Sequence, residues 1–507
     1  RYEPKMAAST VASLVNNLAT SNNKLDSLEQ LKILVSSLSP QELRNVVPNV
    51  SILPVFECLN TQDKTQQEVC CSVLERMLGS LSSALILENL HHEFIRLLQQ
   101  GSEPVQSLCL SQLLRVSAES PELLCQSTDL MVGITSQIAS PNQQLACMAT
   151  TILVNIGETS GGLGTLYSGP IFETLQAVMA KDDTVRYRVY QLVVQLSTIS
   201  PEALEMSNQT GVLTKLINEM QTDDILLQLN CLELLSDLAQ TSQGLAFLDQ
   251  QGTVKRLEEM MATVGESPFG PFLLPGLLKF FGGLARFHPK EVLSHFQVFM
   301  NLLFDVINDK GDPSMKCLAI DTLGFISSTP EGKSALEKQG NTMTECLANL
   351  GKIIKNSPSD MRARALVALA NLLKIQVADQ TEELLRITEN WFSRICANPF
   401  EVIWNIAKQP FSDLKVPAML VLQSLALTPW GQQLMNNAAG FKEYLLDRAM
   451  ENTKEGKEAK FHVVQAIAES PTTADIFGRP FYVQVTEFFR QGAFFVQAQS
   501  EVAYEES

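Results

Sequence analysis

The chain is poor in basic residues and has no run of them. Its 38 Lys and Arg are outnumbered by 55 Asp and Glu, which gives a formal net charge of −17 over 507 residues. A surface that binds nucleic-acid phosphates needs clustered Lys and Arg, so nucleic acid is not an expected partner. A basic surface on another protein suits an acidic chain better.

Aromatic residues are scarce as well, at 7%, whereas hydrophobic residues make up 45% and charged residues 18%. This composition is globular, because a disordered chain would hold fewer apolar residues. A β-sandwich would need more Val, Tyr, Thr and Trp. Composition therefore favours a helical core built from aliphatic side chains.

No secretory signal opens the chain, and no apolar stretch suits a membrane span. The longest one, 268–285, contains Pro271, Pro275 and Lys279, which make it a poor span. The ten cysteines are scattered without any Cys-x-x-Cys pair, as expected for small core residues in a reducing compartment. We expect a cytoplasmic protein that could also enter the nucleus, without a membrane partner and monomeric when free.

Motifs for catalysis are missing too. The five histidines lack partners at ligand spacing, and a metal site needs three or four convergent ligands. The glycine cluster at 161–164 has neither the preceding strand nor the following Lys-Ser/Thr of a phosphate loop, and no Gly-x-Ser-x-Gly elbow occurs. The sequence predicts no catalytic residue, no metal, no cofactor and no enzymatic activity.

What the sequence does contain is an internal repeat of about 41 residues. Asp-Asp-Thr-Val at 182–185 is followed 41 positions later by Asp-Asp-Ile-Leu at 223–226, and Gly211 is followed at the same distance by Gly252. Glycines also recur eight or nine residues apart, at 161/169, 244/252, 332/340 and 431/440. The spacing predicts a short helix between two glycines, the second of which ends it in a left-handed conformation.

The longest helix of each unit is predicted to start at an Asp or Ser cap. The expected ranges are 183–197, 224–239, 312–327 and 359–373. This arrangement is similar to the armadillo repeat. The predicted fold class is all-α, an armadillo/HEAT-type right-handed α-solenoid of about 10–12 repeats.

The expected organisation follows from the regularity of the repeat. Residues 6–495 should form a single solenoid, clearest at 140–340 and irregular at 341–495, where 391–411 would be an insertion or a HEAT-like pair. We expect 267–276, with three prolines and two glycines, to be a loop or packed linker. Residues 1–5 are expected to be a non-native or disordered start, and 496–507 a disordered acidic tail.

Resemblance to nuclear-import adaptors of the armadillo fold indicates which positions face the inner groove. There, many units carry Trp and Asn four residues apart. The corresponding pairs here are Gln191 and Gln195, Glu233 and Asp237, Asp321 and Phe325, Val367 and Asn371, and Thr151 and Asn155 of an earlier unit. The absence of Trp argues against nuclear-import cargo.

We predict that seven of these side chains form a groove for a basic or mixed-charge protein surface: Gln191, Gln195, Glu233, Asp237, Asp321, Phe325 and Asn371. The alternative is that the acidic ones only keep the solenoid soluble. A secondary patch is predicted at Arg186, Tyr187 and Arg188, since Arg and Tyr are common binding anchors. These three could equally pack between neighbouring units.

Five stretches resemble a more specific family. They read Val-Arg-Tyr-Arg-Val-Tyr at 185–190 with Ser-Pro-Glu at 200–202, a phrase at 272–285 ending Leu-Lys-Phe-Phe-Gly-Gly-Leu-Ala, Glu-Asn-Trp-Phe-Ser at 389–393, and Asp-Ile-Phe-Gly at 475–478. Together they resemble the proteasome base assembly chaperones, an armadillo/HEAT-repeat family, from Met6 to about residue 495.

This resemblance implies a partner. Members hold AAA-ATPase subunits of the 19S regulatory particle's base, with associated base precursor subunits, and leave before the 26S proteasome is complete. The client would be the C-terminal region of 26S protease regulatory subunit 7. Three alternatives remain open, namely another armadillo adaptor such as an Hsp70 nucleotide-exchange factor, an enzyme, and a stable structural subunit.

Overall fold

The computed structural model describes residues 4–495 except 22, 223, 290–294 and 309–310. Over these residues it consists of α-helices and short 3-10 turns, without a β-strand. Two compact units divide the chain, Arg1–Thr222 and Asp223–Ser507. The predicted disordered tail 496–507 and residues 1–3 of the predicted start lie outside the described residues, and the first helix begins at Pro4.

The first unit holds fifteen α-helices in its described part. They are α1 (Pro4–Thr20), α2 (Lys24–Ser37), α3 (Pro40–Val46), α4 (Leu53–Glu57), α5 (Lys64–Leu78), α6 (Ser83–Gln100), α7 (Glu103–Glu119), α8 (Pro121–Cys125), α9 (Thr128–Ser136), α10 (Gln143–Gly157), α11 (Gly162–Leu166), α12 (Gly169–Met179), α13 (Asp183–Thr198), α14 (Pro201–Gln209) and α15 (Val212–Glu219).

The second unit continues the same plan. Its helices are α16 (Ile225–Leu238), α17 (Ser242–Gln250), α18 (Thr253–Thr263), α19 (Gly270–Phe287), α21 (Gln297–Asn308), α22 (Pro313–Ile326), α23 (Pro330–Glu337), α24 (Asn341–Asn356), α25 (Ser359–Leu373), α26 (Glu382–Ile395), α27 (Pro399–Ala407), α28 (Ser412–Ala426), α29 (Pro429–Asn437), α30 (Phe441–Leu446), α31 (Lys454–Glu469), α32 (Thr473–Phe477) and α33 (Arg479–Gln491).

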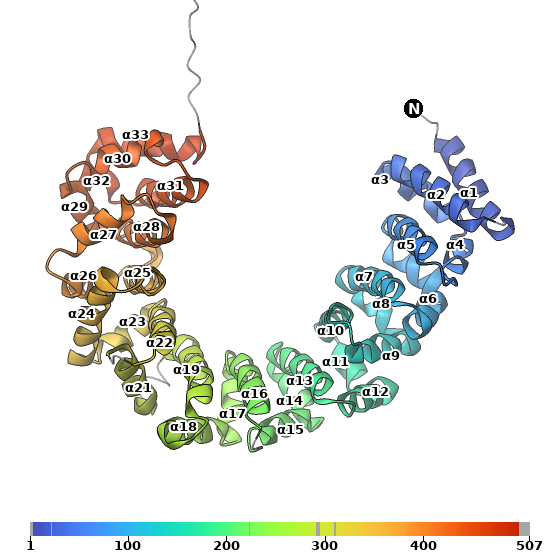
Figure 1. Cartoon of the computed structure of the whole chain (residues 1–507), viewed down its shortest axis with the longest axis horizontal. Helices are drawn as coiled ribbons and strands as arrows, with labels where there is room; N and C mark the ends of the chain where they lie inside the picture. The colour runs from blue at the N-terminus through green and yellow to red at the C-terminus, as the bar shows by residue number, and fades with distance from the viewer. Residues whose placement is uncertain (1–3, 22, 223, 290–294, 309–310, 496–507) are drawn as a thin grey trace, which may run out of the picture. The chain divides into compact units, whose positions relative to one another are not determined.

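One helix of each repeat packs against its counterpart in the next repeat. We call these the ladder helices: α2, α5, α7, α10 and α13 in the first unit, and α16, α19, α22, α25, α28 and α31 in the second. In Figure 1 the ladder helices of the second unit follow one another along one layer, while α18, α21, α24, α26 and α29 belong to another. Within the described residues there are eleven ladder helices. The predicted all-α armadillo/HEAT-type solenoid is therefore confirmed.

The repeat length varies most in the second unit. Successive ladder helices there start at residues 225, 270, 313, 359, 412 and 454, so the longest step separates α25 from α28. The helices α26 and α27 fill that step and cover the stretch predicted as an insertion or a HEAT-like pair. The final step is again close to the usual repeat length.

Local signals explain the predicted helix ends. The carboxylate of Asp224 accepts hydrogen bonds from the backbone N–H groups of Leu226 and Leu227 at 2.9 and 3.2 Å, which starts α16 as predicted. Gly252 has φ +67°, in the left-handed region. Gly244, which precedes Gly252 by eight residues, has a different role. A Cβ on Gly244 would lie 1.9 Å from the Leu238 carbonyl oxygen. Gly244 thus permits α17 to approach the end of α16.

The prediction of a loop or linker at 267–276 is wrong. Helix α19 begins at Gly270 and continues through Pro275 to Phe287. Pro271 lies in the first turn, where a missing N–H is tolerated, and Pro275 removes one interior hydrogen bond. Burial of the following apolar side chains outweighs that loss, since Leu277, Leu278, Phe280, Phe281 and Leu284 are each at most 1% exposed.

Two glycines explain why α19 fits between its neighbours. A Cβ on Gly276 would lie 2.7 Å from Leu232 Cδ2 of α16, and a Cβ on Gly282 would lie 2.6 Å from Thr322 Cγ2 of α22. Both distances are shorter than a normal carbon contact. The glycine content of α19 therefore allows this helix to pack closely against α16 and α22 in the ladder.

Candidate protein-binding surface

The groove positions predicted in the second unit lie on a common surface. Glu233 and Asp237 are exposed on α16, Asp321 and Phe325 on α22, and Val367 on α25. Because α16, α19, α22 and α25 pack in this order, their exposed sides adjoin. We call this the ladder surface; its role in binding stays a prediction.

Helix α19 supplies two ladder positions that the sequence analysis missed. Lys279 is exposed directly after buried Leu278, as Asp321 is exposed after buried Ile320. Gly283 follows one turn later, at the position equivalent to Phe325. These residues could have been found from the buried pattern of α19 if the segment had been assigned as a helix.

A hollow of about 320 Å³ opens in the ladder surface between α16, α19 and α22. Its lining residues are Ser236, Gln240, Lys279, Gly282, Gly283, Phe287, Asp321, Thr322 and Phe325. No heavy atom lies within 4 Å of a Cβ built on Gly283, so this glycine adds open space to the hollow. The size lies at the small end of the range for pockets that hold a side chain or ligand.

One wall of this hollow is aromatic and cationic. The Arg286 guanidinium carbon lies 4.1 Å from the centre of the Phe325 ring, and the Phe287 and Phe325 rings pack edge to face at 6.4 Å. Within the described residues, no carboxylate forms an ion pair with Lys279 or Arg286. The lining therefore presents apolar surface beside the positive charge of Lys279, and Arg286 stacks on the Phe325 ring next to it.

The negative charge of Asp321 is offset by a neighbouring arginine. Its carboxylate forms an ion pair with Arg364 of α25, which also lies 3.4 Å from Asp360. The Asp321 charge raises the pKa of Arg364, so the guanidinium stays charged. Because the two residues are 43 positions apart, their pairing depends on how α22 and α25 pack.

The acidic character of the surface is concentrated on α16. Glu233 and Asp237 lie one turn apart there, and the Gln240 side-chain amide donates to Asp237 at 3.2 Å. Partial burial, followed by the nearby Glu233 charge, raises the pKa of Asp237. The ladder surface thus runs from an acidic end on α16 to the cations of α19 and the neutralised pair between α22 and α25.

Asn371, another predicted groove residue, is half-buried, and its backbone carbonyl is hydrogen-bonded to a buried lysine. Its carbonyl oxygen accepts a hydrogen bond from Lys333 Nζ at 2.6 Å, and the same ammonium donates to the Ser327 carbonyl. Lys333 is buried, and burial lowers its pKa to about 7. One lysine on α23 thus links the carboxyl ends of α22 and α25.

We expect this lysine to make stability depend on pH. Because the pKa is lower in the folded chain than the usual value of about 10.4, the unfolded chain binds more protons between these values, and folding becomes more favourable as pH rises. From pH 7 to 9, the unfolding free energy of the wild type should gain about 2 kcal/mol relative to Lys333→Met.

Urea unfolding of the wild type and of Lys333→Met across this pH range measures the difference. The same comparison with Lys338→Met is the control, since Lys338 is exposed beside the same helix. A difference between wild type and Lys333→Met that does not change with pH would contradict the prediction.

Gln191 and Gln195 belong to the first unit, where both are exposed on α13. Thr151 is exposed on α10, and the Asn155 amide donates to Ser117 Oγ at 2.9 Å. Polar uncharged side chains therefore occupy these positions of the first unit.

The predicted secondary patch is occupied by contacts within the first unit. Arg186 pairs with Glu219 at 2.7 Å and with Asp183 at 2.6 Å. Arg188 donates to the carbonyl oxygens of Ile138 and Ser140 at 2.9 and 2.7 Å. Tyr187 is half-buried between these two residues in sequence. The packing alternative accounts for both arginines.

Other kinds of site are not found in the part of the chain that the structure describes. No group of three or more His, Cys, Asp or Glu side chains there could hold a metal ion. In the same residues, no helix has the length and apolar character to cross a membrane.

Comparison with known proteins decides the family. The model of the family described as "Proteasome non-ATPase 26S subunit" matches residues 7–507. The chain belongs to this family. A relative from Homo sapiens, named 26S proteasome non-ATPase regulatory subunit 5, is 34% identical over 503 residues, 99% of each chain. One of the same name from Drosophila melanogaster is 24% identical over 463 residues, 89% of each chain.

A solved structure supports the fold. The crystal structure of Kap121p matches with a TM-score of 0.59 at 13% sequence identity, covering 94% of this chain and 47% of that chain. At this identity the likeness concerns the helical-repeat fold alone. For this member of the proteasome non-ATPase subunit family, the predicted resemblance is confirmed at the level of the family.

Proposed function

We propose that the chain is a non-catalytic assembly chaperone for the base of the 19S regulatory particle of the 26S proteasome. It would bind AAA-ATPase subunits in a precursor module, together with associated base precursor subunits. The client contact would be the C-terminal region of 26S protease regulatory subunit 7. The chaperone would be released before the particle is complete, and its cytoplasmic or nuclear location stays a prediction.

One observation carries this proposal: relatives named as a 26S proteasome subunit match essentially the whole chain, at 34% identity over 99% of both chains. The repeats that form the ladder surface are thus part of what is shared. A surface with an acidic end, a cationic apolar hollow and a neutralised ion pair suits a partner protein of mixed charge.

The physics of release also fits a surface of this kind. A chaperone must give up its client, so its interface should be of moderate size, about 1,600 Å² in total, instead of an extended hydrophobic seam. Exposed charges supply attraction that steers association without making it permanent. The ladder surface mixes such charges with the apolar hollow between α16, α19 and α22.

Affinity purification with mass spectrometry tests the proposal. Tagged full-length chain should recover proteasomal ATPase subunits without the 20S core, and on gel filtration it should migrate with free base precursors. Recovery of Hsp70 instead would favour another armadillo adaptor. Co-migration with complete 26S particles would favour a stable structural subunit. Either result would overturn the chaperone role.

Charge attraction at the acidic end of the ladder surface should make client binding sensitive to salt. The double change Glu233→Gln and Asp237→Asn should weaken binding of purified 26S protease regulatory subunit 7 about twofold to tenfold at low salt and reduce its salt dependence. Fluorescence titration between 50 and 500 mM salt measures this.

Glu382→Gln with Glu383→Gln is the matched control, because it removes two exposed charges from α26, outside the ladder. Binding by the wild type that does not change between low and high salt would show that Glu233 and Asp237 serve solubility alone.

A further inference from the structure

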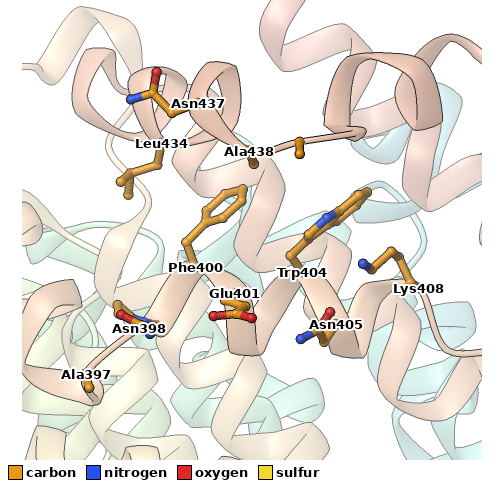
Figure 2. A pocket seen from close by; sticks show the side chains of 12 residues that line it. Ala397, Asn398, Phe400, Glu401, Trp404, Asn405, Lys408, Leu434, Asn437 and Ala438 are labelled. Carbon is orange, nitrogen blue, oxygen red and sulfur yellow. The ribbon is translucent and has the colours of Figure 1, made fainter.

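A second hollow lies away from the ladder helices, between α27 and the end of α29. Its volume is about 570 Å³. Figure 2 shows Phe400 and Trp404 side by side on α27, with Leu434, Asn437 and Ala438 across the opening. Since neither α27 nor α29 is a ladder helix, this site is separate from the proposed client surface.

The floor of the hollow is aromatic and held in place from behind. The Trp404 ring packs on Phe441 and Tyr444 at 5.2 and 4.8 Å between ring centres, and Phe400 packs on Phe441 at 6.2 Å. Leu434, on the opposite wall, is 36% exposed. A rigid aromatic floor facing an exposed leucine is suited to receive an apolar side chain.

The rim carries three side-chain amides, those of Asn398, Asn405 and Asn437. All three are exposed, and none forms a side-chain hydrogen bond with another described residue. Each amide offers both a donor and an acceptor, which is the pair of groups that a peptide unit requires. The rim can therefore hydrogen-bond to an extended backbone without replacing any internal bond.

The charges around the hollow limit what it could bind. One carboxylate, Glu401, and one ammonium, Lys408, belong to the lining, and Lys408 Nζ lies 5.0 Å from the centre of the Trp404 ring. A phosphate-bearing ligand would call for several cations or a bidentate arginine. The rim is instead neutral overall, which matches a segment of low net charge.

We propose that this hollow binds an extended peptide segment of a partner protein, with low net charge and one apolar side chain inserted between Phe400 and Leu434. The amides of Asn405 and Asn437 hydrogen-bond to the peptide backbone on either side of that residue. Affinity comes from the buried apolar side chain, and orientation comes from the amides. This interaction goes beyond the proposed client binding and does not depend on it.

The test uses the full chain and a phage library of random twelve-residue peptides. Enriched peptides should share an apolar residue and low net charge. Binding of a selected synthetic peptide should weaken at least tenfold in the double variant Asn405→Ala/Asn437→Ala. The separate variant Leu434→Lys should also weaken it at least tenfold. Val483→Lys is the matched control, because Val483 is exposed on α33 and its change should leave peptide affinity within twofold.

A second readout separates binding from misfolding. In hydrogen exchange, the peptide should protect 397–408 and 434–441, and the melting temperature of the rim variants should equal that of the wild type. The proposal is overturned if no peptide is enriched, if the enriched peptides bind the rim variants unchanged, or if only phosphorylated or strongly charged ligands bind. ATPase capture, measured on the same variants, reports separately on the chaperone role.

Discussion

Gly283→Leu should weaken binding of the ATPase client about thirtyfold while leaving the fold intact. The glycine lies four residues before the end of α19, and a Cβ at this position would point into open space of the ladder-surface hollow. A leucine there would fill the volume available to a client side chain. Losing a central anchor of an interface commonly removes about 2 kcal/mol, which is about thirtyfold in affinity.

Stability distinguishes this effect from misfolding. A helix-interior glycine is less favourable than other residues by up to about 1 kcal/mol, so the variant should melt at the same temperature as the wild type or slightly higher. Gly164→Leu is the control, because Gly164 is exposed on α11, where a Cβ also meets no atom within 4 Å. A folded Gly283→Leu protein that captures the client normally would remove the hollow from the interface.

Glu451→Gln should destabilise the end of the second unit by about 3–5 kcal/mol, because it leaves a buried lysine without its counter-charge. Glu451 lies 2.7 Å from Lys415 Nζ, and the two side chains are only 2% and 10% exposed. The Tyr444 hydroxyl also donates to Glu451, and together these contacts tie α28 to α30 and the start of α31. Loss of protection in 412–426 and 454–469 by hydrogen exchange measures the effect.

A neighbouring exposed pair provides the comparison. Lys454 and Glu458 lie 3.8 Å apart with side chains 72% and 42% exposed, and Glu458→Gln should change stability by less than about 1 kcal/mol. Adding Lys415→Met to Glu451→Gln should restore much of the loss, since the unpaired buried charge is then gone. If Glu451→Gln and Glu458→Gln lowered the unfolding free energy equally, this account of the buried pair would be contradicted.

Helices whose signals are local could be predicted from the sequence. Asp224 and Asp312 cap α16 and α22 at the expected positions, and the positive φ of Gly252, Gly340 and Gly440 follows from their spacing. Apolar residues at helical spacing then identified four of the ladder helices, α13, α16, α22 and α25, and the resemblance to nuclear-import adaptors indicated the groove pairs on them. Each of these inferences uses residues close together in the chain.

The errors and omissions have one physical origin. Pro271 and Pro275 suggested a linker because local preference opposes a helix there, but burial of Phe280 and Phe281, each at most 1% exposed, decided in favour of α19. Because the start of α19 was assigned to a linker, Lys279 and Gly283 were not aligned with the ladder positions, and the hollow beside them was missed. Interior packing outweighs local preference when enough apolar surface is buried.

By itself, the sequence of this proteasome non-ATPase subunit family member determined an all-helical repeat and its approximate period, while resemblance to nuclear-import adaptors indicated the groove positions. Tertiary structure alone decided that Asp321 is neutralised by Arg364, that Lys333 holds the Asn371 carbonyl, and that Phe400 and Trp404 face Leu434 across a hollow. Helix formation and capping act over a few neighbouring residues. Ion pairs, buried ammonium groups and hollows arise between helices of neighbouring repeats about forty residues apart, where only packing brings the side chains together.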